Sequence, residues 1–111
     1  SITGKTTISE LKNGAIESYQ IEPEEVGLKR SSLEVIRGGA PEKNANILLG
    51  ILQREPGPSR NVILLNAAAV FMAAEKVSNL RDGIEIAKES IDSGRAMKKL
   101  EELIQFTNRK E

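Results

Sequence analysis

Residues 61–74 read NVILLNAAAVFMAA, and every position from Val62 to Ala74 except Asn66 is apolar. A helix that is apolar around its whole circumference has to be surrounded by protein. Asn66 is the only strongly polar group in this run, and burying an amide without a partner costs about 1 to 3 kcal/mol. The stretch therefore predicts a central helix whose Asn66 bonds to the backbone of a neighbouring loop, with ligand contact as the less favoured alternative.

The residues before this run predict two further helices. Ser31-Ser32 can cap a short helix that ends at Ile36, and Gly38-Gly39 offers a left-handed stop. Pro41 suits a first helical position, and apolar residues then recur at helical spacing as far as Leu52. A Pro-Gly-Pro tripeptide separates this helix from the apolar one.

Serines mark the expected starts of the later helices. Ser59 is the expected N-cap of the apolar helix, and Ser78 that of the next helix. Ser93-Gly94 then separates this helix from the last one. The chain therefore carries about five helices after its first residues.

The first residues predict a β-hairpin. Two β-prone runs, residues 6–11 and 16–21, flank Asn13-Gly14, a pair that accepts the positive φ angles of a two-residue turn. Because both faces are half polar, we expect an edge hairpin beside a larger sheet. The turn fixes the register as Leu11 with Ile16, Glu10 with Glu17, Ser9 with Ser18, Ile8 with Tyr19, Thr7 with Gln20 and Thr6 with Ile21.

Composition excludes several classes of function. The 111 residues include 16 acidic and 16 basic side chains, and the only aromatics are Tyr19, Phe71 and Phe106, so no nucleic-acid footprint is expected. The absence of cysteine and histidine rules out disulfides, thiolate metal sites and imidazole chemistry. The apolar run is too short to cross a bilayer, and no signal-peptide layout begins the chain. A soluble, cytoplasmic protein is expected.

Three short motifs invite functional interpretations. Gly4-Lys5-Thr6 ends like a phosphate-binding loop but lacks the required upstream glycine, so a turn before an edge strand is favoured. Arg37-Gly38-Gly39 can present a guanidinium and free amides to an anion, although the end of a helix with a solvated arginine is the favoured interpretation. Glu22, Glu24 and Glu25 suggest a metal site, but a solvated turn before a short helix fits better.

The sequence also resembles a known family. Residues 61–74, together with RGGAPEKNA at 37–45 and IDSGRAMKKL at 91–100, closely resemble the C-terminal third of anthranilate phosphoribosyltransferase. The resemblance covers nearly all of the chain. It implies part of an α/β phosphoribosyltransferase domain, with a strand and hairpin in residues 1–22 and a helical part in residues 23–111. The piece itself is expected to be mainly α.

The resemblance implies a parent enzyme that transfers phosphoribosyl from phosphoribosyl pyrophosphate to anthranilate in tryptophan biosynthesis, with magnesium. The family's Gly-Thr-Gly-Gly-Asp loop, Lys-His-Gly-Asn segment and metal-binding Asp-Glu pair do not occur in this sequence. No catalytic, substrate-binding or metal-binding residue can therefore be transferred. Ser1 and Thr3 would lie nearest the missing Asp-Glu pair, and they are the only candidates for the rim of the site.

We therefore expect a structural portion of such an enzyme, inactive and without a cofactor of its own, whose partner is the upstream part of a homodimeric parent. Both substrates would bind only to the complete enzyme, and no membrane partner is expected. The alternative is a non-enzymatic binding module on the same scaffold, and a related transferase or phosphorylase with another acceptor also stays open. On either enzymatic interpretation, the chain alone should expose apolar surface that the upstream part would cover.

Overall fold

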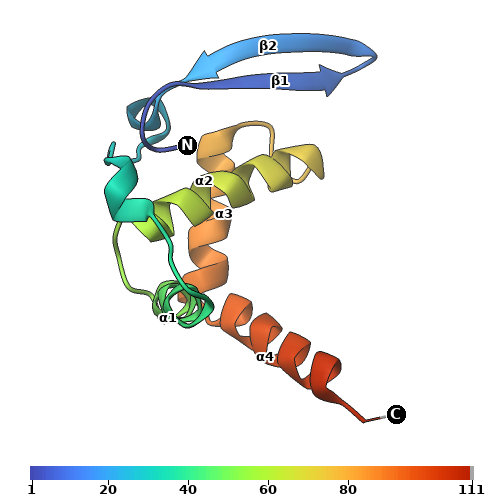
Figure 1. The fold of residues 1–111 in the computed structure, drawn as a ribbon. Coiled ribbons are helices and arrows are strands. Elements are labelled where there is room, and N and C mark those ends of the chain that lie inside the picture. Colours follow the sequence, from blue (N-terminus) through green and yellow to red (C-terminus); the bar gives the residue numbers. More distant parts are fainter. Residues whose placement is uncertain (111) are drawn as a thin grey trace.

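The computed structural model describes residues 1–110, in which a two-stranded hairpin extends above a group of helices (Figure 1). The hairpin is followed by two short 3-10 helices and four α-helices. The elements are β1 (Thr6–Lys12), β2 (Ala15–Ile21), η1 (Pro23–Val26), η2 (Leu33–Ile36), α1 (Pro41–Leu52), α2 (Pro58–Ala73), α3 (Leu80–Asp92) and α4 (Arg95–Asn108).

The predicted hairpin register is confirmed at every pair, from Thr6 opposite Ile21 to Leu11 opposite Ile16. Asn13 and Gly14 adopt φ angles of 52° and 76°, which is the backbone that a two-residue turn requires. Among the described residues the sheet contains only these two strands, and residues 1–5 form no strand, so neither the further strand predicted before the hairpin nor a larger sheet beside it is present in this part of the chain. Since an isolated hairpin is marginally stable in water, packing against other elements has to hold it.

The centre of the fold is the crossing of α2 and α3, which lie across each other in Figure 1. Leu64 and Ala68 of α2 are buried against Ile84 of α3. Gly83 brings the two backbones together, because a Cβ atom placed on it would lie 2.8 Å from the Cα of Ala68. The absence of a side chain at Gly83 therefore sets the distance between the two helices.

Hydrogen bonds to backbone carbonyl groups hold the segments around the hairpin in place. Ile2 is fully buried, and its carbonyl oxygen accepts a hydrogen bond from the amide of Ser31 at 3.1 Å. On the other side, the Nε of Arg81 in α3 donates to the carbonyl oxygen of Glu25 in η1 at 3.0 Å. The hairpin thus joins the helices through the residues that flank it.

The starts of two helices differ from the predictions. Helix α2 begins at Pro58 with Gly57 as its N-cap, so Ser59 is already helical, because proline is preorganised for the first helical turn. Helix α3 is capped by Asn79 rather than Ser78, since the Asn79 Oδ1 accepts a hydrogen bond from the amide of Asp82 at 2.9 Å. The predicted break between the last two helices is confirmed, with Gly94 at φ 85°.

The short helix before Gly38-Gly39 also differs in detail. It is the 3-10 helix η2, and the side chain of its N-cap Ser32 makes no capping hydrogen bond. The predicted left-handed stop is wrong, because neither Gly38 nor Gly39 has a positive φ and the helix ends at Arg37 in an extended conformation. The glycines serve close packing instead, since a Cβ on Gly38 would lie 2.5 Å from the Oδ1 of Asn44.

The expected exposure of apolar surface is confirmed. Helix α2 buries only Leu64, Leu65 and Ala68, and Val70 is 65% exposed. The apolar composition of this helix predicted that protein surrounds it, and within this chain that prediction is wrong. No side chain of helix α4 is fully buried, although Ala96 packs against the core. Among residues 1–110, no helix combines the length and the apolar character that crossing a membrane requires.

Candidate functional site

The two rim candidates, Ser1 and Thr3, form a small cluster of hydroxyl groups at the start of the chain. The Ser1 Oγ lies 2.9 Å from the Thr3 Oγ1, and it also accepts a hydrogen bond from the Thr3 amide at 3.2 Å. The terminal amine of Ser1 donates to the Oγ1 of Thr6 at 2.9 Å. These hydroxyl groups lie beside the buried Ile2, so the fold holds them in a defined position next to the hairpin.

Asn66 does not have the predicted environment. Its side chain is exposed, and its Nδ2 donates to the carbonyl oxygen of Val62, one turn earlier in the same helix, at 2.9 Å. The prediction of a bond to a neighbouring loop is therefore wrong. The physical reason is that α3 covers only one side of α2, and Asn66 lies on the side that α3 does not cover.

The Arg37-Gly38-Gly39 segment is hydrogen-bonded to Asn44, a contact that the sequence did not predict. The amide of Gly39 donates to the Oδ1 of Asn44 at 2.8 Å, and the Nδ2 of Asn44 donates back to the carbonyl oxygen of Gly39 at 2.9 Å. Asn44 lies in the first turn of α1, five residues after Gly39. This reciprocal pair holds the entry to α1, and it occupies an amide that an anion would need.

The acidic residues after the hairpin pair with an arginine. Arg30 donates to Glu24 through its Nε at 2.9 Å and its Nη2 at 3.1 Å, and it lies 3.4 Å from a carboxylate oxygen of Glu22. The Glu25 carboxylate accepts a hydrogen bond from the Glu22 amide at 3.1 Å. Glu22 is the N-cap of η1, and Glu24 and Glu25 lie within it. The glutamates therefore hold a turn that precedes the short helix η2, as predicted, and this turn is itself a 3-10 helix.

The guanidinium of Arg30 donates to Glu24 and lowers the pKa of this carboxyl from 4.5 to about 2. Because the pKa is lower in the folded chain, the contact favours folding above about pH 4.5, and this contribution is lost as the pH falls towards 2. Carboxyl carbon NMR should show Glu24 titrating near pH 2 and should show Arg30→Gln returning the pKa towards 4.5. Equal pKa values in the two proteins would contradict the assignment.

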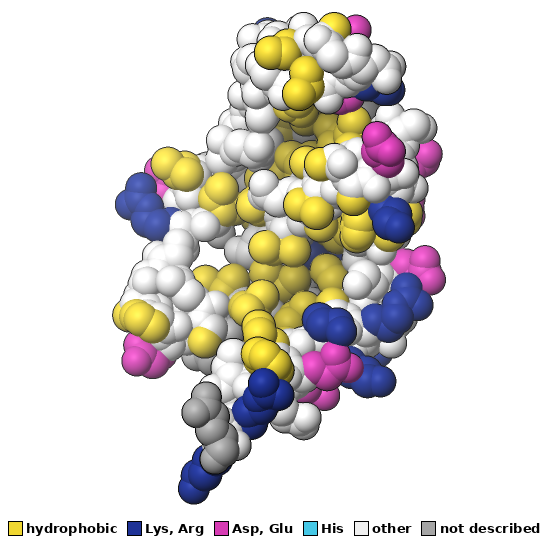
Figure 2. Space-filling view, turned by 90° about the vertical axis from the view of Figure 1, so that its right-hand side faces the viewer, with side chains coloured by type: hydrophobic (Ala, Val, Ile, Leu, Met, Phe, Trp, Pro, Cys, Tyr) yellow, Lys and Arg dark blue, Asp and Glu magenta, His cyan; other side chains and the backbone are white. Residues whose placement is uncertain are grey.

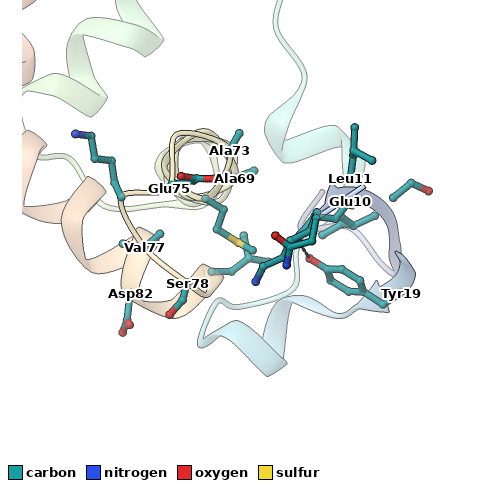
Figure 3. Close-up of a pocket in the computed structure, with 16 residues that line it drawn as sticks. Glu10, Leu11, Tyr19, Ala69, Ala73, Glu75, Val77, Ser78 and Asp82 are labelled. Atoms are coloured by element: carbon teal, nitrogen blue, oxygen red, sulfur yellow. Dashed lines mark hydrogen bonds between the residues drawn. The ribbon is translucent and has the colours of Figure 1, made fainter. Parts of the chain in front are cut away.

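A hollow lies between the hairpin and the end of α2, where Figure 3 shows side chains from both elements facing each other. Its volume is about 890 Å³. On the hairpin side, the Tyr19 hydroxyl donates to the Oε2 of Glu10 at 3.3 Å, and partial burial together with the Glu10 charge raises the pKa of Tyr19. The opposite wall comes from α2 and the following loop, and includes Ala69, Met72, Ala73, Glu75, Lys76 and Ser78.

Sequence analysis missed this hollow, because its walls come from segments about 50 residues apart whose approach depends on tertiary packing. One signal was available, since the predicted register places Ile8 and Tyr19 on the same face of the hairpin. That face is the one that turns towards α2.

The polar side chains of the described residues carry hydroxyl groups, carboxylates, amines, guanidinium groups and amides. Within residues 1–110, no group of three or more acidic side chains lies close enough together to hold a metal ion. The side-chain clusters that the structure brings together hold turns, helix ends and the start of the chain in place. The arrangement is that of a scaffold.

Comparison with known proteins shows the family to which the chain belongs. Residues 1–97 match the family described as "Glycosyl transferase family, a/b domain", and the chain belongs to this family. Its curated relatives include the anthranilate phosphoribosyltransferases of Symbiobacterium thermophilum, 50% identical over 98% of this chain, and Petrotoga mobilis, 48% identical over 97%. The aligned regions make up 32% and 31% of these relatives, so the chain spans about a third of their length.

Solved structures show the same fold within longer chains. The anthranilate phosphoribosyltransferase of Thermus thermophilus superposes with a TM-score of 0.86 and 38% identity, covering 96% of this chain and 32% of its own. A serine-to-alanine variant of the Saccharomyces cerevisiae enzyme, solved with Mg bound, gives a TM-score of 0.80 and 31% identity over 91% of this chain and 30% of its own.

Proposed function

We propose that this chain is the C-terminal structural portion of an enzyme that transfers phosphoribosyl from phosphoribosyl pyrophosphate to anthranilate, a step of tryptophan biosynthesis in the cytoplasm. The observation that carries the proposal is the 50% identity to an anthranilate phosphoribosyltransferase over 98% of the chain. The TM-score of 0.86 against the Thermus enzyme supports it, because the same hairpin and helices exist inside a longer chain of that name.

In this proposal the chain supports the reaction without performing it. The upstream part of a homodimeric parent contributes the groups that bind both substrates and magnesium, while the present residues supply packing and position. Ser1 and Thr3 are the residues proposed for the rim of the site, because their hydroxyl cluster is held against the buried Ile2. Preorganised donors are needed to stabilise a transferring group, and in this proposal they come from the upstream part.

Activity assays provide the test. Incubated with phosphoribosyl pyrophosphate, anthranilate and magnesium, the chain alone should give no product above the blank. A chimera that carries this chain in place of the C-terminal third of the Symbiobacterium relative should form the product. Turnover by the highly purified chain alone would contradict the structural role.

The chimera also separates the alternatives. A folded chimera without activity would favour the non-enzymatic binding module. Activity with an acceptor other than anthranilate would favour a related transferase only if the unmodified Symbiobacterium enzyme lacks that activity, so this enzyme is the matched control.

A further inference from the structure

Helix α4 differs from the rest of the chain in how little it is packed. It runs over 14 residues, from Arg95 to Asn108, and none of its side chains is buried. Figure 1 shows it extending away from the other helices, with the C-terminus at its far end. A helix of this length is only marginally stable in water by itself, so tertiary packing has to hold it. The first turn of α4 packs against the core through Ala96, whereas residues 101–108 are all exposed.

One side of α4 is apolar and largely exposed, although the guanidinium of Arg109 lies 4.2 Å from the centre of the Phe106 ring. Leu103, Ile104 and Phe106 are 55%, 51% and 60% exposed. Helical spacing places them on one side of α4, with Gln105 on the opposite side. Figure 2 shows hydrophobic side chains gathered in a stripe that runs from the hairpin, across the middle of the molecule, to this C-terminal helix. A large exposed apolar patch of this kind marks a site of interaction with protein, membrane or a ligand.

The comparisons indicate that α4 keeps its position inside a longer chain. The match to the family domain ends at residue 97, at the start of α4. The Symbiobacterium relative nevertheless aligns with 98% of the chain, and the Thermus structure superposes on 96% of it, so most of α4 is included in both. In the Thermus chain, the aligned region is accompanied by about twice as much additional protein.

From these observations we infer that the apolar side of α4 is a docking surface for the upstream two-thirds of the parent chain, and that it fastens this scaffold to that part. The inference rests on the proposed function and adds the surface through which the two parts bind. The occupant is a folded protein segment that presents a complementary apolar surface, since the three exposed side chains that carry the face are uncharged.

Aspartate substitution of Phe106 tests the inference, because the side chain is exposed in the chain alone but would be buried in the parent. In the isolated chain, Phe106→Asp should leave the helical circular dichroism signal unchanged. In the chimera with the Symbiobacterium enzyme, the same change should lower the thermal midpoint by about 3 °C or more. Gln105→Asp is the matched control and should alter neither protein.

Equal effects of Phe106→Asp and Gln105→Asp in the chimera would overturn the inference. So would concentration-dependent self-association of the isolated chain that Phe106→Asp abolishes, because the occupant would then be a second copy. If the chimera does not fold, the same pair of substitutions is made at the aligned positions of the Symbiobacterium enzyme. The thermal midpoint tests the docking surface, whereas the activity of the unsubstituted chimera tests the proposed function, so the two failures are distinguishable.

Discussion

Gly83→Val is expected to lower the free energy of unfolding of this chain by roughly 3 kcal/mol, the upper end of the usual cost of overpacking a core. A Cβ atom on Gly83 would lie 2.8 Å from both the Cα and the Cβ of Ala68, and 3.0 Å from the Ala68 carbonyl oxygen. Two of these three atoms belong to the backbone, so a rotamer change cannot relieve the contact. The helices α2 and α3 would have to move apart.

Urea unfolding followed by circular dichroism measures this effect, and Gly4→Ala is the matched control. A Cβ atom on Gly4 would have no atom within 4 Å, and Gly4 has no positive φ, so adding a methyl group there meets open space. The control should change stability by less than about 0.5 kcal/mol. A Gly83→Val midpoint equal to that of the control would show that the two helices are not in close contact in solution.

The second large effect is expected from Leu64→Ala, which should cost roughly 2 to 5 kcal/mol. Leu64 is 1% exposed and lies at the α2–α3 crossing, so its removal leaves a cavity as well as losing buried apolar area. Val70→Ala in the same helix is the control, because Val70 is 65% exposed and should lose little. If the two substitutions were equally destabilising, Leu64 would not lie in the core.

The pairing of the two hairpin strands could be predicted because its determinants are local. Asn13-Gly14 selects the turn, and the turn fixes the register. The observed pairs, from Thr6 opposite Ile21 to Leu11 opposite Ile16, are the predicted ones. Helical spacing likewise predicted α1 and its first residue, Pro41. In both cases the decisive residues are within a few positions of one another.

Predictions that depended on a neighbour were less successful. Asn66 was expected to be buried because its helix is apolar, but composition does not tell which side of a helix another element covers. The serine caps failed for a related reason, since Pro58 and Asn79 offered better starts one residue away from Ser59 and Ser78. The pairing of Asn44 with Gly39 required knowing how α1 begins.

For the candidate site, the sequence predicted a structural role without catalytic residues, and this stays a prediction. It also predicted Ser1 and Thr3 as rim residues, which stays a prediction. The hollow between the hairpin and α2 could not be anticipated, because its volume is set by how far the hairpin stands from the helices. That distance depends on buried contacts such as those of Ile2, which no local pattern encodes.

Ser93 and Gly94 form a short connection between α3 and α4, so the backbone angles of these two residues set the direction of the last helix. Gly94 adopts φ 85°, and the 14-residue helix that follows is about 21 Å long. A rotation of about 10° at this connection would therefore displace the far end of the helix by roughly 4 Å. The position of Phe106 thus depends on the torsion angles of this connection, and a small angular difference at the base of α4 becomes a shift of several ångströms at its tip.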